Sequence, residues 1–301
     1  MILSIDCDLI TVDKLAPMAD QTIETDMLRL DKIHPQISGN KWFKLKYYVD
    51  LALAQKKSGI LTLGGAWSNH IHAVAAAAAQ LKMHSIGIIR GERPASLSNT
   101  LLDAEALGMQ LLFISREQYR HRESLFNEMA ERFPDHLIVD EGGAGPVGVR
   151  GAADILNYVP HPHQYTHILA AVGTGTMLAG LCSAASSHQL ILGISSLKGE
   201  DRISDTIKPW LPEEKWSQFR IMNQFHFGGY ARHQPELIGF MNRFYEQNNI
   251  PTDMVYTGKL CYAWNQLCES GYFPSGSKLL LIHSGGLQGN RSLSKGKLVF
   301  Q

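Results

Sequence analysis

Short apolar runs alternate along this chain with longer stretches in which apolar residues recur at helical spacing. In the first half the expected strands are 59–63, 85–89 and 110–114, and the expected helices are 70–81, 98–107 and 117–132. This alternation predicts an α/β fold, with parallel twisted sheets flanked by helices.

The same rhythm returns after residue 160, with apolar runs at 167–172, 190–194 and 278–282. A glycine-rich stretch, 142–151, lies between the two series and is typical of a connection. We therefore expect two α/β domains.

The charge balance and the apolar stretches of the chain limit the kinds of molecule that the protein is expected to bind. Lys plus Arg and Asp plus Glu balance at 28 each, so no basic surface is available for nucleic acid or for an anionic membrane. No apolar stretch is long enough to span a membrane, and the acidic start of the chain does not fit a secretion signal. We expect a cytoplasmic protein that acts on a small molecule.

The cysteines and histidines give no sign of a metal site. The four cysteines contain no C-x-x-C pair, and the 13 histidines form no His-Glu-x-x-His motif. We expect free thiols and no metal, which makes a metal hydrolase a poor interpretation.

The first candidate for chemistry is Lys41, in the sequence Ser-Gly-Asn-Lys that precedes a helical pattern. The positive end of a helix dipole disfavours an ammonium group, and burial would lower the pKa further. A lysine made partly neutral can attack an aldehyde. Taken alone, an ordinary solvated lysine is the commoner explanation of such a motif.

Two glycine-rich turns offer backbone N–H groups to anions. In Gly64-Gly-Ala-Trp-Ser-Asn-His70 a strand ends and a helix starts, so Ser68 or Asn69 would cap the helix or bind an anion. The run Val172-Gly-Thr-Gly-Thr176 lacks the ending of a nucleotide P-loop and the third glycine of a dinucleotide fingerprint. It predicts a cradle for a single phosphate group, unless it is a plain structural turn.

Taken in order, these segments resemble the pyridoxal 5′-phosphate (PLP) family that contains 1-aminocyclopropane-1-carboxylate (ACC) deaminase and D-cysteine desulfhydrase. The resemblance covers nearly the whole chain and also includes Val255-Tyr-Thr-Gly-Lys259. It implies the fold of the tryptophan synthase β-subunit. It also implies a larger PLP-binding domain of residues 1–50 and 153–301 and a smaller domain of residues 51–152.

The resemblance assigns a role to each motif. Lys41 would form the Schiff base with PLP, and Val172, Gly173, Thr174, Gly175 and Thr176 would hold its phosphate. Asn69 would bond the ring hydroxyl, Tyr256 would stack on the ring, and Thr257 would meet the pyridine nitrogen. Ser68, Asn69, His70, Tyr230 and Ser284 would contact the substrate, and Lys41, Ser68, Tyr230 and Tyr256 would take part in catalysis.

Thr257 and Ser284 favour one branch of the family. ACC deaminases look like Val-Tyr-Glu-Gly-Lys where this chain has Thr257, and D-cysteine desulfhydrases look like Val-Tyr-Thr-Gly-Lys. A hydroxyl leaves the pyridine nitrogen unprotonated and the ring a weaker electron sink, which suits prompt loss of a β substituent. Ser284 is also hydroxylic, like the threonine that the desulfhydrases have there.

The resemblance therefore implies a PLP-dependent enzyme that degrades a small amino acid, with D-cysteine giving pyruvate, sulfide and ammonia, and a homodimer. L-Cysteine, D-serine and β-chloroalanine remain open as substrates. The alternatives are ACC deaminase and a PLP-binding protein without turnover.

Overall fold

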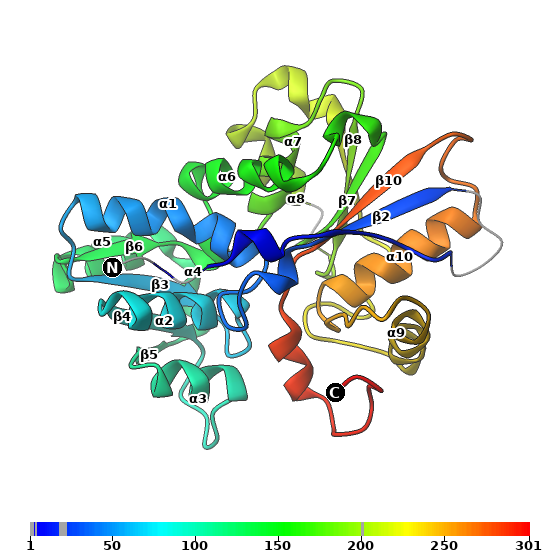
Figure 1. The fold of residues 1–301 in the computed structure, drawn as a ribbon. Helices are drawn as coiled ribbons and strands as arrows, with labels where there is room; N and C mark the ends of the chain where they lie inside the picture. Colours follow the sequence, from blue (N-terminus) through cyan, green and yellow to red (C-terminus); the bar gives the residue numbers. More distant parts are fainter. Residues whose placement is uncertain (1–2, 4, 18–22, 200–201) are drawn as a thin grey trace.

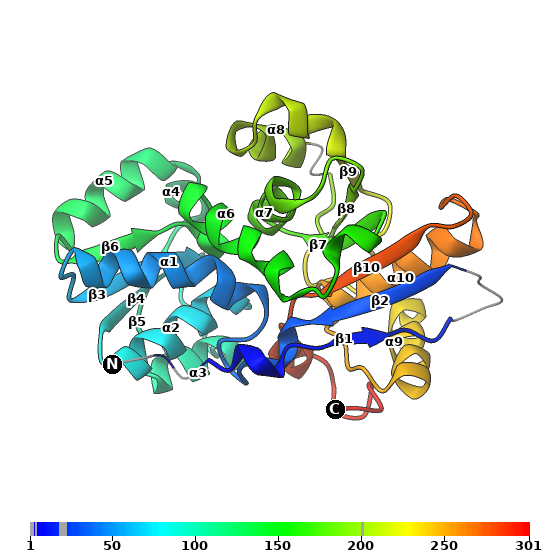
Figure 2. The same cartoon turned by 45° about the horizontal axis from the view of Figure 1, so that its top comes forward.

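The computed structural model describes residues 3, 5–17, 23–199 and 202–301. Two sheets organise the chain and lie side by side (Figures 1 and 2). The smaller has the order β5-β4-β3-β6, and the larger has the order β1-β2-β10-β7-β8-β9. All pairings are parallel except that of β1 with β2, so the α/β expectation is confirmed.

The smaller sheet is covered on both faces. Its strands are β3 (Gly59–Gly64), β4 (His84–Arg90), β5 (Gln110–Ile114) and β6 (His136–Val139). Alternate apolar residues of the strands pack on α1 (Asn40–Ala54), α2 (Asn69–Leu81) and α3 (Asn99–Ala106). The opposite face packs on α4 (Arg116–Arg120) and α5 (Arg122–Arg132).

The larger sheet is also sandwiched between helices. Its strands are β1 (Val12–Lys14), β2 (Glu24–Arg29), β7 (His167–Val172), β8 (Leu190–Ser195), β9 (Phe219–Met222) and β10 (Lys278–His283). One face packs on α6 (Pro146–Ala153), α7 (Thr176–Ala184) and α8 (Ile203–Ile207). The other face packs on α9 (Pro235–Asn248) and α10 (Thr257–Glu269).

Helix α1 joins the two cores. Phe43 belongs to the core of the larger sheet, whereas Leu45 and Val49 belong to the core of the smaller one. We propose the two domains, 51–152 and 1–50 with 153–301, as the units of the fold. A domain boundary at residue 50 falls within α1, which packs into the cores of both domains.

One predicted helix is divided. The stretch 117–132 forms α4 and α5, separated at His121, whose φ of −85° and ψ of 66° are not helical. Ser115 and Gln118 form a reciprocal capping box that starts α4 on its own. Among the described residues, no helix is long and apolar enough to cross a membrane.

Candidate active site

A cavity of about 540 Å³ opens where the carboxyl ends of strands from both sheets meet the starts of α1, α2 and α7. It is lined by most of the predicted site residues: Lys41, Ser68, Asn69, His70, Val172, Gly173, Thr174, Gly175, Tyr230, Tyr256 and Ser284. Thr176 and Thr257 do not line it, and both are fully buried behind residues that do. Ligand sites in α/β proteins commonly form at such strand ends.

Lys41 stands at the start of α1 because of a glycine. Gly39 has a φ of +65°, and a methyl group on it would lie 2.0 Å from the carbonyl oxygen of Ser284. The N–H of Asn40 donates to that same oxygen, so the loop after β10 fixes the start of α1. Burial lowers the pKa of Lys41 to about 8, against the opposing charge of Asp253. Burial is thus the main cause of the lowered pKa, and it is one of the two causes, with the helix dipole, that the sequence suggested.

Tyr256 forms one wall of the cavity beside this lysine. The Lys41 Nζ lies 5.7 Å from the centroid of the Tyr256 ring. A methyl group on Gly173 would lie 3.2 Å from the Tyr256 hydroxyl, so a larger residue would crowd the ring. Tyr230 packs edge to face on Tyr256 and donates to the carbonyl oxygen of Trp67 at 3.3 Å.

The segment from Ser68 to His70 serves both roles that the sequence left open. The Ser68 Oγ accepts from the N–H of Ile71 and caps α2, while the residue also lines the cavity. Asn69 accepts from the Gln288 amide at 3.0 Å. His70 is buried, and neither ring nitrogen has a partner within the described protein.

The turn at Gly173–Gly175 leads directly into α7. Gly175 has a φ of +82°, which L side chains rarely adopt, and the two hydroxyls of Thr174 and Thr176 lie 3.0 Å apart. Backbone N–H groups at such a helix start attract a phosphate. Thr176 contributes to the turn through Thr174 and not to the cavity surface.

Lys44 is a cavity residue that the motif analysis missed. It lies one turn after Lys41 on α1 and is 4% exposed. Burial, followed by the charge of Lys41, lowers its pKa well below the ordinary value. Burial and these two lysines also lower the pKa of His70. The i, i+3 spacing from Lys41 is the signal that could have identified Lys44.

Thr257 is engaged with Asp253. Its hydroxyl donates to the Asp253 carboxylate at 2.7 Å and accepts from the Asp253 N–H at 2.7 Å. The same carboxylate accepts from the backbone N–H groups of Val255, Tyr256 and Thr257. The Asp253 carboxylate therefore holds the turn that presents Tyr256 to the cavity.

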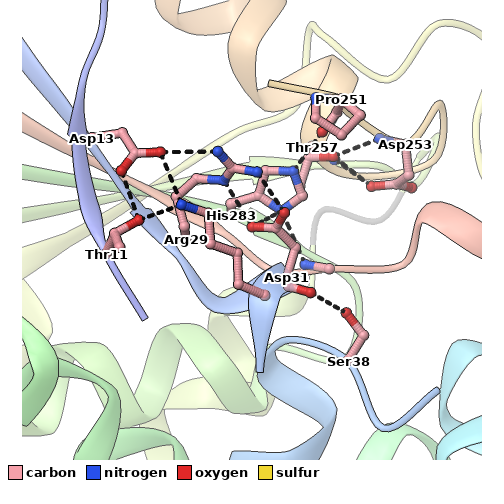
Figure 3. Close-up of polar contacts among 11 residues, drawn as sticks. Thr11, Asp13, Arg29, Asp31, Ser38, Pro251, Asp253, Thr257 and His283 are labelled. Carbon is pink, nitrogen blue, oxygen red and sulfur yellow. Dashed lines mark hydrogen bonds and ion pairs between the residues drawn. The ribbon is translucent and has the colours of Figure 1, made fainter. Parts of the chain in front are cut away.

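An ionic network includes His283, the residue that precedes Ser284 in the chain (Figure 3). The Arg29 guanidinium pairs with Asp13 at 2.9 Å and with Asp31 at 2.7 Å. Asp31 also lies 3.3 Å from the His283 ring, whose other nitrogen is 2.8 Å from the Pro251 carbonyl oxygen. Burial would raise the pKa of Asp31, but His283 and Arg29 lower it below the ordinary value.

The fold and the cavity define a two-sheet enzyme of the PLP-dependent class. The chain matches the family model described as pyridoxal-phosphate dependent enzyme over residues 12–285 and belongs to that family. It is 28% identical over 281 residues to the bifunctional D-cysteine desulfhydrase/ACC deaminase of Arabidopsis thaliana, covering 84% of this chain and 70% of that one. It is 27% identical over 274 residues to a putative ACC deaminase of Pyrococcus abyssi, covering 84% and 81%.

Solved structures agree with this assignment. The crystal structure of an ACC deaminase homologue superposes with a TM-score of 0.78 at 25% identity, covering 93% of this chain and 90% of that one. An O-acetylserine dependent cystathionine β-synthase from Helicobacter pylori, with a TM-score of 0.66 at 16% identity and coverage of 98% and 99%, shares the fold. The expected resemblance, fold and cofactor are thus confirmed.

The cavity suits PLP on its own geometry. It brings together an amine with a pKa of about 8, a glycine-rich turn at a helix start and an aromatic ring beside the amine. Lys44 adds a buried amine whose protonated form a phosphate would stabilise. These are the groups that an aldehyde, a phosphate and a flat ring each require.

Proposed function

We propose that this protein is a PLP-dependent lyase that converts D-cysteine to pyruvate, sulfide and ammonia. The observation that carries the proposal is that Lys41 and the turn at 172–175 line one cavity, although they are far apart in the sequence. A single cofactor can then be held by the amine at one end and by the phosphate cradle at the other.

Lys41 serves as the anchor and as the base. When bound, PLP supplies an aldehyde carbon that the lysine holds covalently and a ring that draws electrons from the substrate α-carbon. With a substrate bound, the free Nζ of Lys41 would accept the α-proton. A pKa of about 8 leaves a useful fraction of this amine neutral near pH 7 to 8.

The segment from Ser68 to His70 orients the substrate carboxylate. Ser68, Asn69 and His70 line the cavity at the start of α2, and neither ring nitrogen of His70 has a partner among the described residues. Holding the carboxylate there fixes which bond at the α-carbon points to Lys41.

Tyr230 acts as a neutral donor. Burial raises the pKa of Tyr230 to about 12, and burial also raises the pKa of Tyr256 well above its ordinary value. Both phenols therefore keep their protons near neutral pH. This argues against either tyrosine as the base and leaves that role to Lys41.

Asp253 and Thr257 support elimination over ring opening. The Thr257 proton is directed to the Asp253 carboxylate, and that carboxylate already accepts from three backbone N–H groups. Neither residue offers a free acid to a pyridine nitrogen. With a weaker electron sink, the reaction is favoured when the β substituent leaves promptly after proton loss.

The experiment is a substrate comparison on the PLP-loaded protein. We expect pyruvate and sulfide from D-cysteine, and little 2-oxobutanoate from ACC. Efficient formation of 2-oxobutanoate from ACC would make this chain an ACC deaminase. A coloured protein that is inert towards D-cysteine, ACC and D-serine would overturn the assignment as an enzyme.

A further inference from the structure

Arg90 is a cavity cation that the proposed chemistry does not use. It is the last residue of β4, which pairs with β3 beside Gly64, so it stands at the carboxyl edge of the smaller sheet. Arg90 lines the cavity together with Ser68 and Tyr230. A methyl group on Gly65 would lie 3.5 Å from one guanidinium nitrogen, which places Arg90 beside the Gly65 end of the Ser68 loop.

Two arginines, Arg90 and Arg122, lie over the aromatic ring of Tyr119, and they differ in their other contacts. Arg90 lies 5.4 Å from the ring centroid and Arg122 lies 4.2 Å from it. Arg122 is neutralised by Glu141 at 2.6 Å and by Asp140 at 3.6 Å. Arg90 forms no ion pair with any carboxylate of the described residues.

Arg90 is therefore a positive charge in the cavity to which the proposed chemistry assigns no partner. Arg122 is offset by the two acids, and Lys41 and Lys44 serve the aldehyde and the phosphate. Arg90 is an exposed residue that lines the same cavity as Ser68, and its guanidinium lies over the Tyr119 ring. A planar guanidinium without a partner is suited to a carboxylate, sulfonate or thiolate.

We propose that Arg90 determines specificity by binding an anionic group on the β-carbon of the substrate. This inference rests on the proposed function and names its substrate class as amino acids whose β substituent carries a negative charge when the substrate binds. In the reaction, the α-proton passes to Lys41, the bond from the β-carbon to its substituent breaks with both electrons leaving on the substituent, and a carbon–carbon double bond forms. Arg90 stabilises the charge on that substituent. Water then replaces the amine, giving the 2-oxo acid and ammonia.

A matched ligand pair tests the inference without turnover. Aspartate and asparagine have nearly the same shape, differ in one charge and carry no β-leaving group. Calorimetric titration of the PLP-loaded protein, with both enantiomers, should give tighter binding of aspartate by about tenfold or more. Arg90→Met should abolish this preference, and Arg90→Lys should keep part of it.

Arg93→Met is the control. Arg93 lies on the same lobe, packs on the Phe113 ring at 5.3 Å and pairs with Glu105 outside the cavity. It should retain the wild-type preference for aspartate. If Arg90→Met weakened aspartate and asparagine equally, Arg90 would bind the α-carboxylate and the inference would be wrong. Equal affinity of the wild type for both ligands would also overturn it.

Turnover separates this inference from the proposed function. We expect the ratio of kcat/KM for cysteate over 3-chloroalanine to fall about tenfold or more in Arg90→Met. An unchanged ratio would refute the role of Arg90 while leaving a working lyase. Absence of 2-oxo acid from every substrate would refute the lyase, and a retained preference for aspartate in binding would still support Arg90.

Discussion

At the scale of single residues, Lys41 shows how position changes chemistry. The same amine in water would be almost fully charged at neutral pH, whereas burial in the cavity brings its pKa to about 8. The opposing carboxylate of Asp253 is turned towards backbone N–H groups and so only partly restores the charge. The reactive form is thus available without a separate activating base.

We therefore predict the pH dependence of cofactor loading. The rate at which the cofactor-free protein reacts with PLP should rise about tenfold per pH unit below pH 8 and level off above it, because only the neutral amine attacks. The absorbance of the covalent adduct reports this rate. A midpoint above pH 10 would show that Lys41 is an ordinary solvated lysine. Lys41→Ala should lose both the absorbance band and the turnover.

Lys44 gives a second prediction at this scale. Lys44→Met removes a buried amine that lines the same cavity as the phosphate turn and that a bound phosphate would draw into its protonated form, so PLP should be lost more readily, with Kd raised about tenfold to a hundredfold. Dialysis against buffer without cofactor, followed by absorbance, measures the loss. Lys46→Met, on the same helix but paired with Asp154, is the control and should retain PLP like the wild type. Equal retention in Lys44→Met would exclude a phosphate role.

The sequence identified cavity residues where they belong to short motifs of consecutive residues. Lys41, the Ser68 segment and the Val172 turn were identified in this way, and the cavity gathers all three. Arg90 and Lys44 were missed because each is a single charge within an ordinary strand or helix. The contact of Thr257 with the cofactor stays a prediction. The hydrogen bond from Thr257 to Asp253, four residues earlier, could not be predicted, because it depends on a turn that composition does not reveal.

At the scale of elements, α10 holds the loop that carries Tyr230. Lys259 on this helix is nearly fully buried, and burial lowers its pKa to about 8. Its Nζ donates to the carbonyl oxygens of His226 and Gly229, both at 2.8 Å. Tyr230 follows the second of these residues directly, so the helix sets how far the phenol reaches into the cavity.

We predict that Lys259→Met lowers kcat/KM about tenfold while PLP stays bound, because the two carbonyl oxygens lose their donors and Tyr230 shifts. Lys259→Gln keeps an amide donor and should recover part of the activity. Steady-state kinetics and the cofactor absorbance together check this. Loss of PLP in parallel with activity would indicate general damage to the fold instead.

Some secondary-structure elements could be predicted from the sequence and others could not, for physical reasons. The buried parallel strands β3, β4, β7, β8 and β10 stand out as apolar runs, and their existence followed from the pattern. Strand β2 was not predicted, because the polar residues Glu24 and Asp26 interrupt its apolar pattern. It nevertheless pairs with a strand on each side. The break at His121 depends on one residue with a non-helical ψ, which apolar spacing does not detect.

At the scale of the molecule, three helices packed through glycine join the two halves. A methyl group on Gly151 of α6 would lie 1.9 Å from the Phe43 carbonyl oxygen of α1. A methyl group on Gly180 of α7 would lie 2.5 Å from the Ala152 side chain. The backbones of α1, α6 and α7 therefore approach as closely as they do only because these positions carry no side chain.

We predict that Gly151→Ala lowers the free energy of unfolding by about 2–4 kcal/mol, because α6 must move away from α1. Urea unfolding followed by circular dichroism measures the change. Gly239→Ala is a matched control on α9, where the nearest atom is the flexible end of Arg243 at 3.6 Å. It should be neutral or stabilise by up to about 1 kcal/mol. A neutral Gly151→Ala would contradict the tight join.

The place of β10 in the larger sheet has a consequence for how the enzyme is made. This strand comes after both β2 and β7 in the chain, yet it lies between them in the sheet, and the loop after it fixes the residue next to Lys41. During synthesis, β2 and β7 emerge from the ribosome long before their shared neighbour. A nascent chain therefore carries the reactive lysine without the wall that positions it, and the aldehyde-binding site is complete only after β10 and Ser284 have also emerged.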